Sequence, residues 1–141
     1  MQQSRIYKEG EEQAGLYKDI FDVAADGLIV NDLESGLVVM ANPAACAMHG
    51  YTHAEFIGLA LIACIHSDSQ FVFSESIQVF QPDGVFDIQT LDVCRDGSTF
   101  YAVWRGTAYT YQGRPCLLNV VRDVSKRMQI EQLLGRRVEV R

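Results

Sequence analysis

The stretch from Asp26 to Gly58 constrains the fold most, because it sets short structural elements directly beside one another. An apolar run at 28–30 is followed by a polar turn at 32–36 and by a second apolar run at 37–40. Two apolar runs around a tight polar turn are typical of an antiparallel strand pair. We therefore expect the domain to begin with two neighbouring strands.

Helix signals follow this strand pair at once. Asn42 can accept hydrogen bonds from a first helical turn, and Pro43 suits the first helical position. Gly50 is placed to end that helix. Thr52 and Glu55 have the spacing of a capping box, which predicts a second short helix immediately afterwards.

The order strand, turn, strand, Asn-Pro-Ala, short helix and Gly-Tyr-Thr-x-x-Glu-Phe-Ile-Gly closely resembles the first half of a PAS domain, the sensory module of many signalling proteins. Segments 65–68, 94–100 and 121–127 extend the resemblance, which runs from about Leu16 to the end of the chain. It implies an α+β fold with a five-stranded antiparallel sheet in the order 2-1-5-4-3. Short helices would cover one face, and an N-terminal amphipathic helix and a C-terminal exit helix would flank the core.

The second half of the chain supports such a sheet. A helix is expected at 69–80, followed by strands at 86–94, 99–111 and 116–121. The joints between these strands are short, so the strands should pair antiparallel in sequence order. Arg105 marks the solvent side of the long strand. The helix-covered side of that strand is then expected to carry Phe100, Ala102, Trp104, Gly106 and Ala108.

We divide the chain into an N-terminal helical extension (1–24), a PAS core (25–123) and a C-terminal helix (124–141). In the extension, apolar residues recur at helical spacing, so this helix can cover the sheet or pair with a partner's helix. The C-terminal residues follow a 3-4-3 spacing, as in a coiled coil, although a solvated helix would look similar. We expect a homodimer whose signalling helices meet through Leu16, Ile20, Phe21, Ile130, Leu133 and Val140.

The final segment, LLGRRVEVR, resembles the start of linkers that join PAS domains to histidine kinase or cyclic-dinucleotide synthase domains. This resemblance implies a covalently linked output domain outside the chain.

Several residues on the covered side of the sheet could line a ligand pocket. The family pattern would turn Asn119 toward the covered side, where a buried amide must find partners. It can bond to backbone or water, or it can orient a small ligand. Small residues beside Trp104 can leave a cavity or simply fit a filled core. The pocket candidates are Val30, Met40, Phe56, Ile62, Ile65, Phe71, Ala102, Trp104 and Asn119.

The resemblance also limits the cofactor. Light-oxygen-voltage photosensors carry N-C-R-F-L-Q after the second short helix, whereas here only Cys64 is present and it falls late. Haem-binding PAS domains use a histidine in the helix that corresponds to 69–80, which has none. We therefore expect neither a flavin photoadduct nor haem, and the cofactor stays unknown. His66 is expected to cap or pack, and His49 and His53 are expected to be solvated at helix ends.

Composition excludes several other classes. The net charge of −6 disfavours nucleic acid and anionic membranes as partners of the whole domain. The longest apolar stretch, at 56–65, is too short to span a bilayer, and the N-terminus lacks a signal-like apolar region, so we expect a cytosolic location. Four cysteines without C-x-x-C spacing predict no zinc site. Only Cys94, next to Arg95, has the cation that a redox sensor would need.

No catalytic motif is present: the sequence has no G-x-S-x-G, phosphate-binding loop or H-E-x-x-H. Two functions are therefore weighed. The first is a sensory input domain that binds a small apolar or amphipathic molecule. The second is a ligand-free module for protein interaction and dimerisation.

Overall fold

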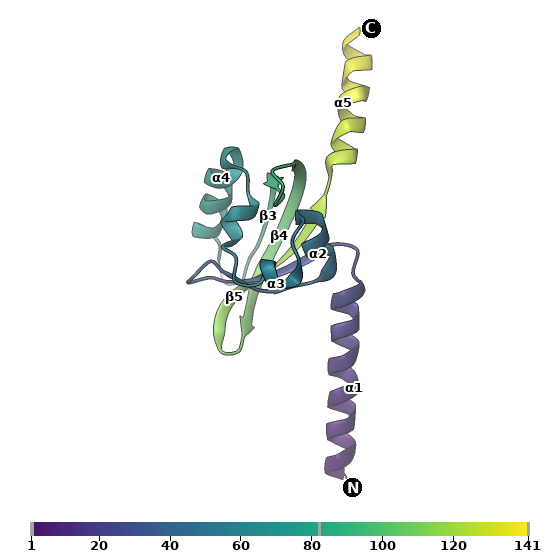
Figure 1. Cartoon of the computed structure of the whole chain (residues 1–141), viewed down its shortest axis with the longest axis vertical. Coiled ribbons are helices and arrows are strands. Elements are labelled where there is room, and N and C mark those ends of the chain that lie inside the picture. Colours follow the sequence, from purple (N-terminus) through teal and green to yellow (C-terminus); the bar gives the residue numbers. More distant parts are fainter. Residues whose placement is uncertain (1, 82, 141) are drawn as a thin grey trace.

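The computed structural model describes residues 2–81 and 83–140, and gives side-chain surroundings for residues 10–81 and 83–135. The five strands form one antiparallel sheet in the order β2-β1-β5-β4-β3, which confirms the expected fold. Short helices lie on one face of this sheet, and the terminal helices extend from the core in opposite directions (Figure 1). The elements are α1 (Gln2–Val23), β1 (Gly27–Asp32), β2 (Val38–Ala41), α2 (Pro43–His49), α3 (His53–Phe56), the 3₁₀ turn η1 (Leu61–Cys64), α4 (Ser67–Gln78), β3 (Val85–Val93), β4 (Thr99–Tyr111), β5 (Arg114–Asp123) and α5 (Ser125–Val140).

The helix signals in the first half of the chain act as the sequence predicts. The Asn42 side chain caps α2 by accepting from the backbone N–H of Ala45 at 2.9 Å. Gly50 ends α2 with φ 78°, a left-handed conformation that favours glycine. Thr52 and Glu55 form the expected capping box at the start of α3.

Two tight turns connect the last three strands. Gly97 has φ 89° in the turn between β3 and β4. Gln112 (φ 51°) and Gly113 (φ 76°) form a two-residue turn between β4 and β5. Because only these two residues are needed for the turn, β5 begins at Arg114, earlier than the predicted strand at 116–121.

Helix α4 begins two residues earlier than expected. The Nδ1 atom of His66 accepts a hydrogen bond from the backbone N–H of Asp68 at 3.1 Å, so His66 is the N-terminal cap. The preceding apolar stretch contains η1, which the sequence pattern did not predict.

The register of β4 settles which residues face the helices. Four residues alternate on the covered side and are buried, as predicted: Phe100, Ala102, Trp104 and Gly106. Ala108, which is predicted on the same side, is exposed. Gly106 pairs with Phe86, and the Phe86 ring occupies the space that a Cβ at Gly106 would need. Phe73 of α4 packs edge-on against both Phe86 and Trp104. The centre of the core is therefore aromatic and closely filled.

Candidate functional site

A hollow of about 420 Å³ lies between α4, η1 and the turn that joins β1 to β2. Its volume is within the range of small-molecule sites. The lining combines apolar side chains with uncharged polar ones, and contains no acid or base. Its residues are Asn31, Ser35, Gly36, Ala60, Leu61, Ile62, Phe73, Ser74, Ile77 and Gln78.

Asn119 is linked to this hollow by its hydrogen bond to Asn31, which lines it. It faces the covered side, as expected, and is 0% exposed. Its Nδ2 atom donates to the Oδ1 atom of Asn31 at 2.8 Å and to the carbonyl oxygen of Ile29 at 3.1 Å. Its Oδ1 atom is buried and has no hydrogen-bond partner among the described residues. A buried acceptor in this state costs about 1–3 kcal/mol.

Three predicted pocket residues lie elsewhere. The register pairs Ile29 with Ala41, and both belong to the inner core, so their neighbours Val30 and Met40 point to the opposite face of the sheet. Phe71 is 74% exposed, because it lies on the opposite side of α4 from the buried Phe73. These three predicted pocket residues therefore do not line this hollow.

The remaining candidates are divided between the hollow and the filled core. Ile62 lines the hollow and is 37% exposed. Phe56, Ile65, Ala102 and Trp104 are at most 1% exposed and pack in the core cluster. The hollow therefore lies closer to α4 and Asn31 than the sequence indicated.

The core also contains a histidine–aspartate pair that sequence reasoning missed. His49 was expected to be solvated, which is wrong: His49 and Asp92 are both 0% exposed. The His49 Nε2 atom lies 2.9 Å from the Asp92 Oδ2 atom, and its Nδ1 atom lies 2.9 Å from the carbonyl oxygen of Ala45. Since a carbonyl can only accept, Nδ1 carries a proton, and a second proton lies between Nε2 and the carboxyl group.

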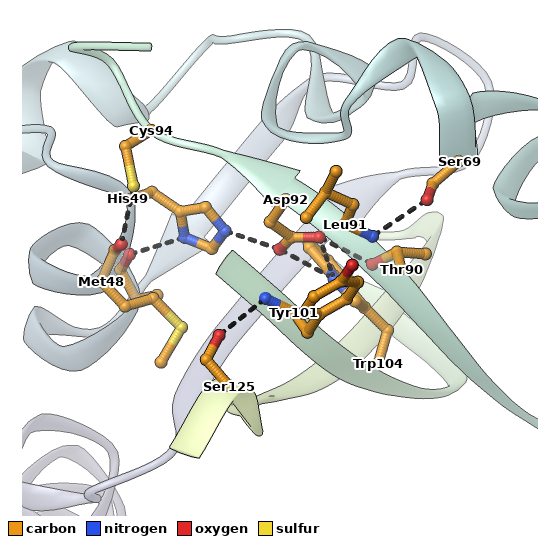
Figure 2. A network of polar contacts seen from close by, with 11 residues as sticks. Met48, His49, Ser69, Thr90, Leu91, Asp92, Cys94, Tyr101, Trp104 and Ser125 are labelled. Atoms are coloured by element: carbon orange, nitrogen blue, oxygen red, sulfur yellow. Dashed lines mark hydrogen bonds and ion pairs between the residues drawn. The ribbon is translucent and has the colours of Figure 1, made fainter. Parts of the chain in front are cut away.

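Two further donors complete this polar network (Figure 2). The Trp104 Nε1 atom donates to both carboxyl oxygens of Asp92, at 3.1 and 3.0 Å. The Thr90 hydroxyl donates to Asp92 Oδ1 at 2.6 Å. The network therefore joins α2, β3 and β4 through one buried carboxyl group. The spacing in α2 could have indicated that His49 is buried, because His49 follows Ala45 by four residues and so lies on the same side of the helix.

The other histidines and the cysteines have simpler surroundings. His66 caps α4, in line with its expected role, and His53 is exposed. Burial raises the pKa of the Cys64 thiol to about 12, which makes it a poor nucleophile. Cys94 is half-buried, and its thiol donates to the carbonyl oxygen of Met48 at 3.3 Å.

The terminal helices are tied to the core by hydrogen bonds. The Asn42 side chain donates to the carbonyl oxygens of Phe21 and Asp26 at 3.1 and 3.0 Å, while its oxygen accepts from Leu28 and Ala45. All four hydrogen-bonding positions of this amide are thus used at the end of α1.

At the other end of the core, α5 begins against β4. The Ser125 hydroxyl accepts from the backbone N–H of Tyr101 at 2.8 Å, and Asp123 accepts from the N–H of Ser125 at 2.9 Å. A shift of β4 or β5 would therefore reach the start of α5 directly.

The predicted signalling faces are largely open to solvent. Leu16 and Ile20 are 56% and 54% exposed, so α1 does not cover the sheet, and Phe21 is half-buried. In α5, Ile130 and Leu133 are 50% and 60% exposed. The side chain of Val140 lies outside the described residues.

Neither a membrane span nor a metal site is found in the part of the chain that the structure describes. No helix there is both long and apolar enough to cross a membrane. No group of three or more His, Cys, Asp or Glu side chains there is arranged to hold a metal ion.

A family model described as "PAS domain" matches residues 15–87, just over half of the chain. The chain belongs to the PAS domain family. Solved PAS structures share its fold at low sequence identity. The PAS domain of an HTR-like protein from Haloarcula marismortui has a TM-score of 0.74 and 23% identity, over 85% of this chain and 98% of that one.

Two further solved structures are similar. A PAS domain from Colwellia psychrerythraea has a TM-score of 0.70 and 20% identity, over 80% of this chain and 98% of that one. A sensory box histidine kinase/response regulator from Burkholderia thailandensis has a TM-score of 0.67 and 20% identity, over 87% of this chain and 95% of that one. The comparison with curated proteins gives no significant match.

Proposed function

We propose that this PAS domain is the sensory input unit of a larger signalling protein and binds a small apolar or amphipathic ligand in the hollow beside α4. The observation that carries this proposal is the hollow of about 420 Å³, whose lining of apolar and uncharged polar side chains is typical of a small-molecule site.

The signal would leave the core through the terminal helices of a dimer and reach a covalently linked output domain. The exposed apolar residues of α1 and α5 support this part of the proposal, because a helix with an open apolar face is stabilised by pairing with another helix. A second copy of the chain presents the same faces.

Native mass spectrometry with an absorbance scan tests the ligand. We expect the native protein to carry extra mass that denaturation releases. Ile77→Trp, which fills the hollow, should remove that mass. Phe71→Trp is the matched control, because it adds the same ring to the exposed side of α4 and should leave the mass unchanged. Extra mass that persists in Ile77→Trp would contradict the proposed site.

Analytical ultracentrifugation across micromolar concentrations tests the dimer. Ile20→Glu should shift the equilibrium toward monomer by placing a charge on the apolar face of α1. Lys18→Glu is the control, because Lys18 is exposed and lies between the apolar positions. A wild-type protein that stays monomeric with its helices formed would refute the dimer.

The ligand-free interaction module is the second candidate, and the packed core favours it. The core is filled around four of the predicted pocket residues and leaves no room for a ligand among them: Phe56, Ile65, Ala102 and Trp104. Under this alternative the wild-type protein carries no mass beyond that of the chain or its dimer. Ile77→Trp then removes no bound mass and does not alter association.

A further inference from the structure

The orientation of the Asn31 amide is set by Asn119. The Nδ2 atom of Asn119 lies 3.1 Å from the carbonyl oxygen of Ile29, so this branch of the Asn119 amide is the donor. The same atom lies 2.8 Å from the Oδ1 atom of Asn31. Turning the Asn31 amide over would bring two NH2 groups together, so the Asn31 oxygen faces Asn119 and is already used.

Asn31 itself lines the hollow and is 2% exposed. Its strand pairing with Leu117 of the inner core places its side chain on the helix-covered face of the sheet. The two branches of an amide diverge, and the oxygen branch is turned to Asn119, which does not line the hollow. The N–H branch is therefore the polar group that Asn31 can present to a ligand there.

This N–H branch is poorly used within the protein. The Nδ2 atom of Asn31 carries two N–H groups, and their one contact among the described residues is with the carbonyl oxygen of Asp32 at 3.4 Å. That contact is longer than the usual range of an N–H···O hydrogen bond and can occupy only one of the two groups. At least one buried N–H of Asn31 is thus left for an acceptor.

The other polar groups of the lining limit the charge of a ligand. They are the uncharged side chains of Ser35, Ser74 and Gln78. An anion would lose part of its hydration there without gaining a cation from the lining, which is unfavourable. The lining therefore favours a neutral ligand.

Resting on the proposed function, we infer that the hollow selects a neutral carbonyl compound, such as a ketone, ester or amide, whose oxygen accepts a hydrogen bond from the Nδ2 atom of Asn31. A buried donor without an acceptor is costly, so a ligand that supplies an acceptor gains affinity over a ligand of the same shape without one. The apolar part of the ligand lies along four side chains of the lining: Leu61, Ile62, Phe73 and Ile77.

Two probes of matched shape, 2-octanone and 2-methyl-1-octene, test the inference. They differ only in that a C=O group of the ketone is a C=CH2 group in the alkene. In ¹⁵N–¹H spectra of the wild-type protein, the ketone should move the side-chain amide signals of Asn31 downfield, as a new hydrogen bond does, and the alkene should not. Sodium octanoate at neutral pH should bind more weakly than 2-octanone. These comparisons do not depend on any variant folding.

Two variants assign the effect. Asn31→Leu keeps nearly the same shape but removes the donor. It should raise the Kd of 2-octanone about tenfold, as expected for the loss of one net hydrogen bond, and should not weaken the binding of the alkene. Ser74→Ala, which removes a lining hydroxyl, should leave the Kd of both probes unchanged.

The results separate the selectivity from the site. Asn31 signals that the bound ketone does not move, an equal rise in the Kd of both probes in Asn31→Leu, or tighter binding of octanoate than of 2-octanone overturns the inference. If the probes bind without these differences and Ile77→Trp abolishes their binding, the proposed ligand site stands without the inferred selectivity. If no probe binds the wild-type protein, both the selectivity and the ligand site are refuted.

Discussion

Removal of His49 tests whether the Asp92 carboxyl group is held in the core by its polar partners. His49→Leu fills a similar volume but removes the contact between Nε2 and Asp92 Oδ2 at 2.9 Å. With the shared proton on His49, the contact is a charge-assisted hydrogen bond, which contributes about 1.5–3 kcal/mol. In that charge state the variant also leaves a fully buried carboxylate without a cation. Breaking such a pair typically costs about 3–5 kcal/mol, so we expect a loss of about 4 kcal/mol in the free energy of unfolding.

Asp92→Asn separates the loss of the pair from a loss of packing. Its amide oxygen can still accept from Trp104 and Thr90, and its amide nitrogen can donate to a neutral His49 ring. The single variant should therefore lose only about 1–2 kcal/mol. Added to His49→Leu, it removes the uncompensated carboxylate and should restore about 1–2 kcal/mol.

Urea unfolding followed by the fluorescence of Trp104, the single tryptophan, measures all four proteins. With a slope of about 2 kcal/mol/M, His49→Leu should lower the midpoint by about 2 M. The double variant should unfold at a higher urea concentration than His49→Leu. If the double variant is the less stable of the two, the cost of His49→Leu comes from packing and the electrostatic reasoning is refuted.

Three further changes test other parts of the fold. Gly106→Ala should destabilise the fold by about 1–3 kcal/mol, because the new Cβ meets the Phe86 ring. Urea unfolding measures this loss. If the loss is just as large in a protein that also carries Phe86→Leu, the clash with Phe86 is not its cause. The pKa of Asp32 is lowered, chiefly by a backbone N–H that donates to it, so its stabilisation is present at neutral pH and lost as the pH falls below about 4. Asp32→Asn should flatten this acid dependence in thermal unfolding, and equal slopes would contradict it. Cys94→Ser should remove the fastest-reacting thiol in labelling with a disulfide reagent. Cys94 is half-buried, whereas burial raises the pKa of the Cys64 thiol to about 12. A fast labelling phase that persists in Cys94→Ser would contradict this.

Helix boundaries and turns could be predicted because their causes are local. The cap at Asn42 and the capping box at Thr52 depend on atoms only three residues away, which the sequence displays directly. The same holds for the side of α4 that faces the core. Phe73 and Ile77 share one side of the helix at helical spacing and are buried and half-buried, whereas Phe71 lies outside that side and is exposed.

The pocket could not be predicted in the same way. Ile29 and Val30 are both apolar and both nearly fully buried, so hydrophobicity does not tell which of them faces the helices. The pairing of Ile29 with Asn119 decides it, and a shift of one residue would exchange the two faces.

The sequence by itself determined the strand and helix order, the turns and the membership in the PAS family, because each depends on neighbouring residues or on a motif read in order. Only the tertiary structure decided that His49 meets Asp92, which lies 43 residues away. It also decided that the buried Asn119 amide bonds to Asn31, which lies 88 residues away and lines the hollow. A buried polar group is satisfied by whatever the fold brings beside it, and that depends on strand register and helix docking rather than on local sequence.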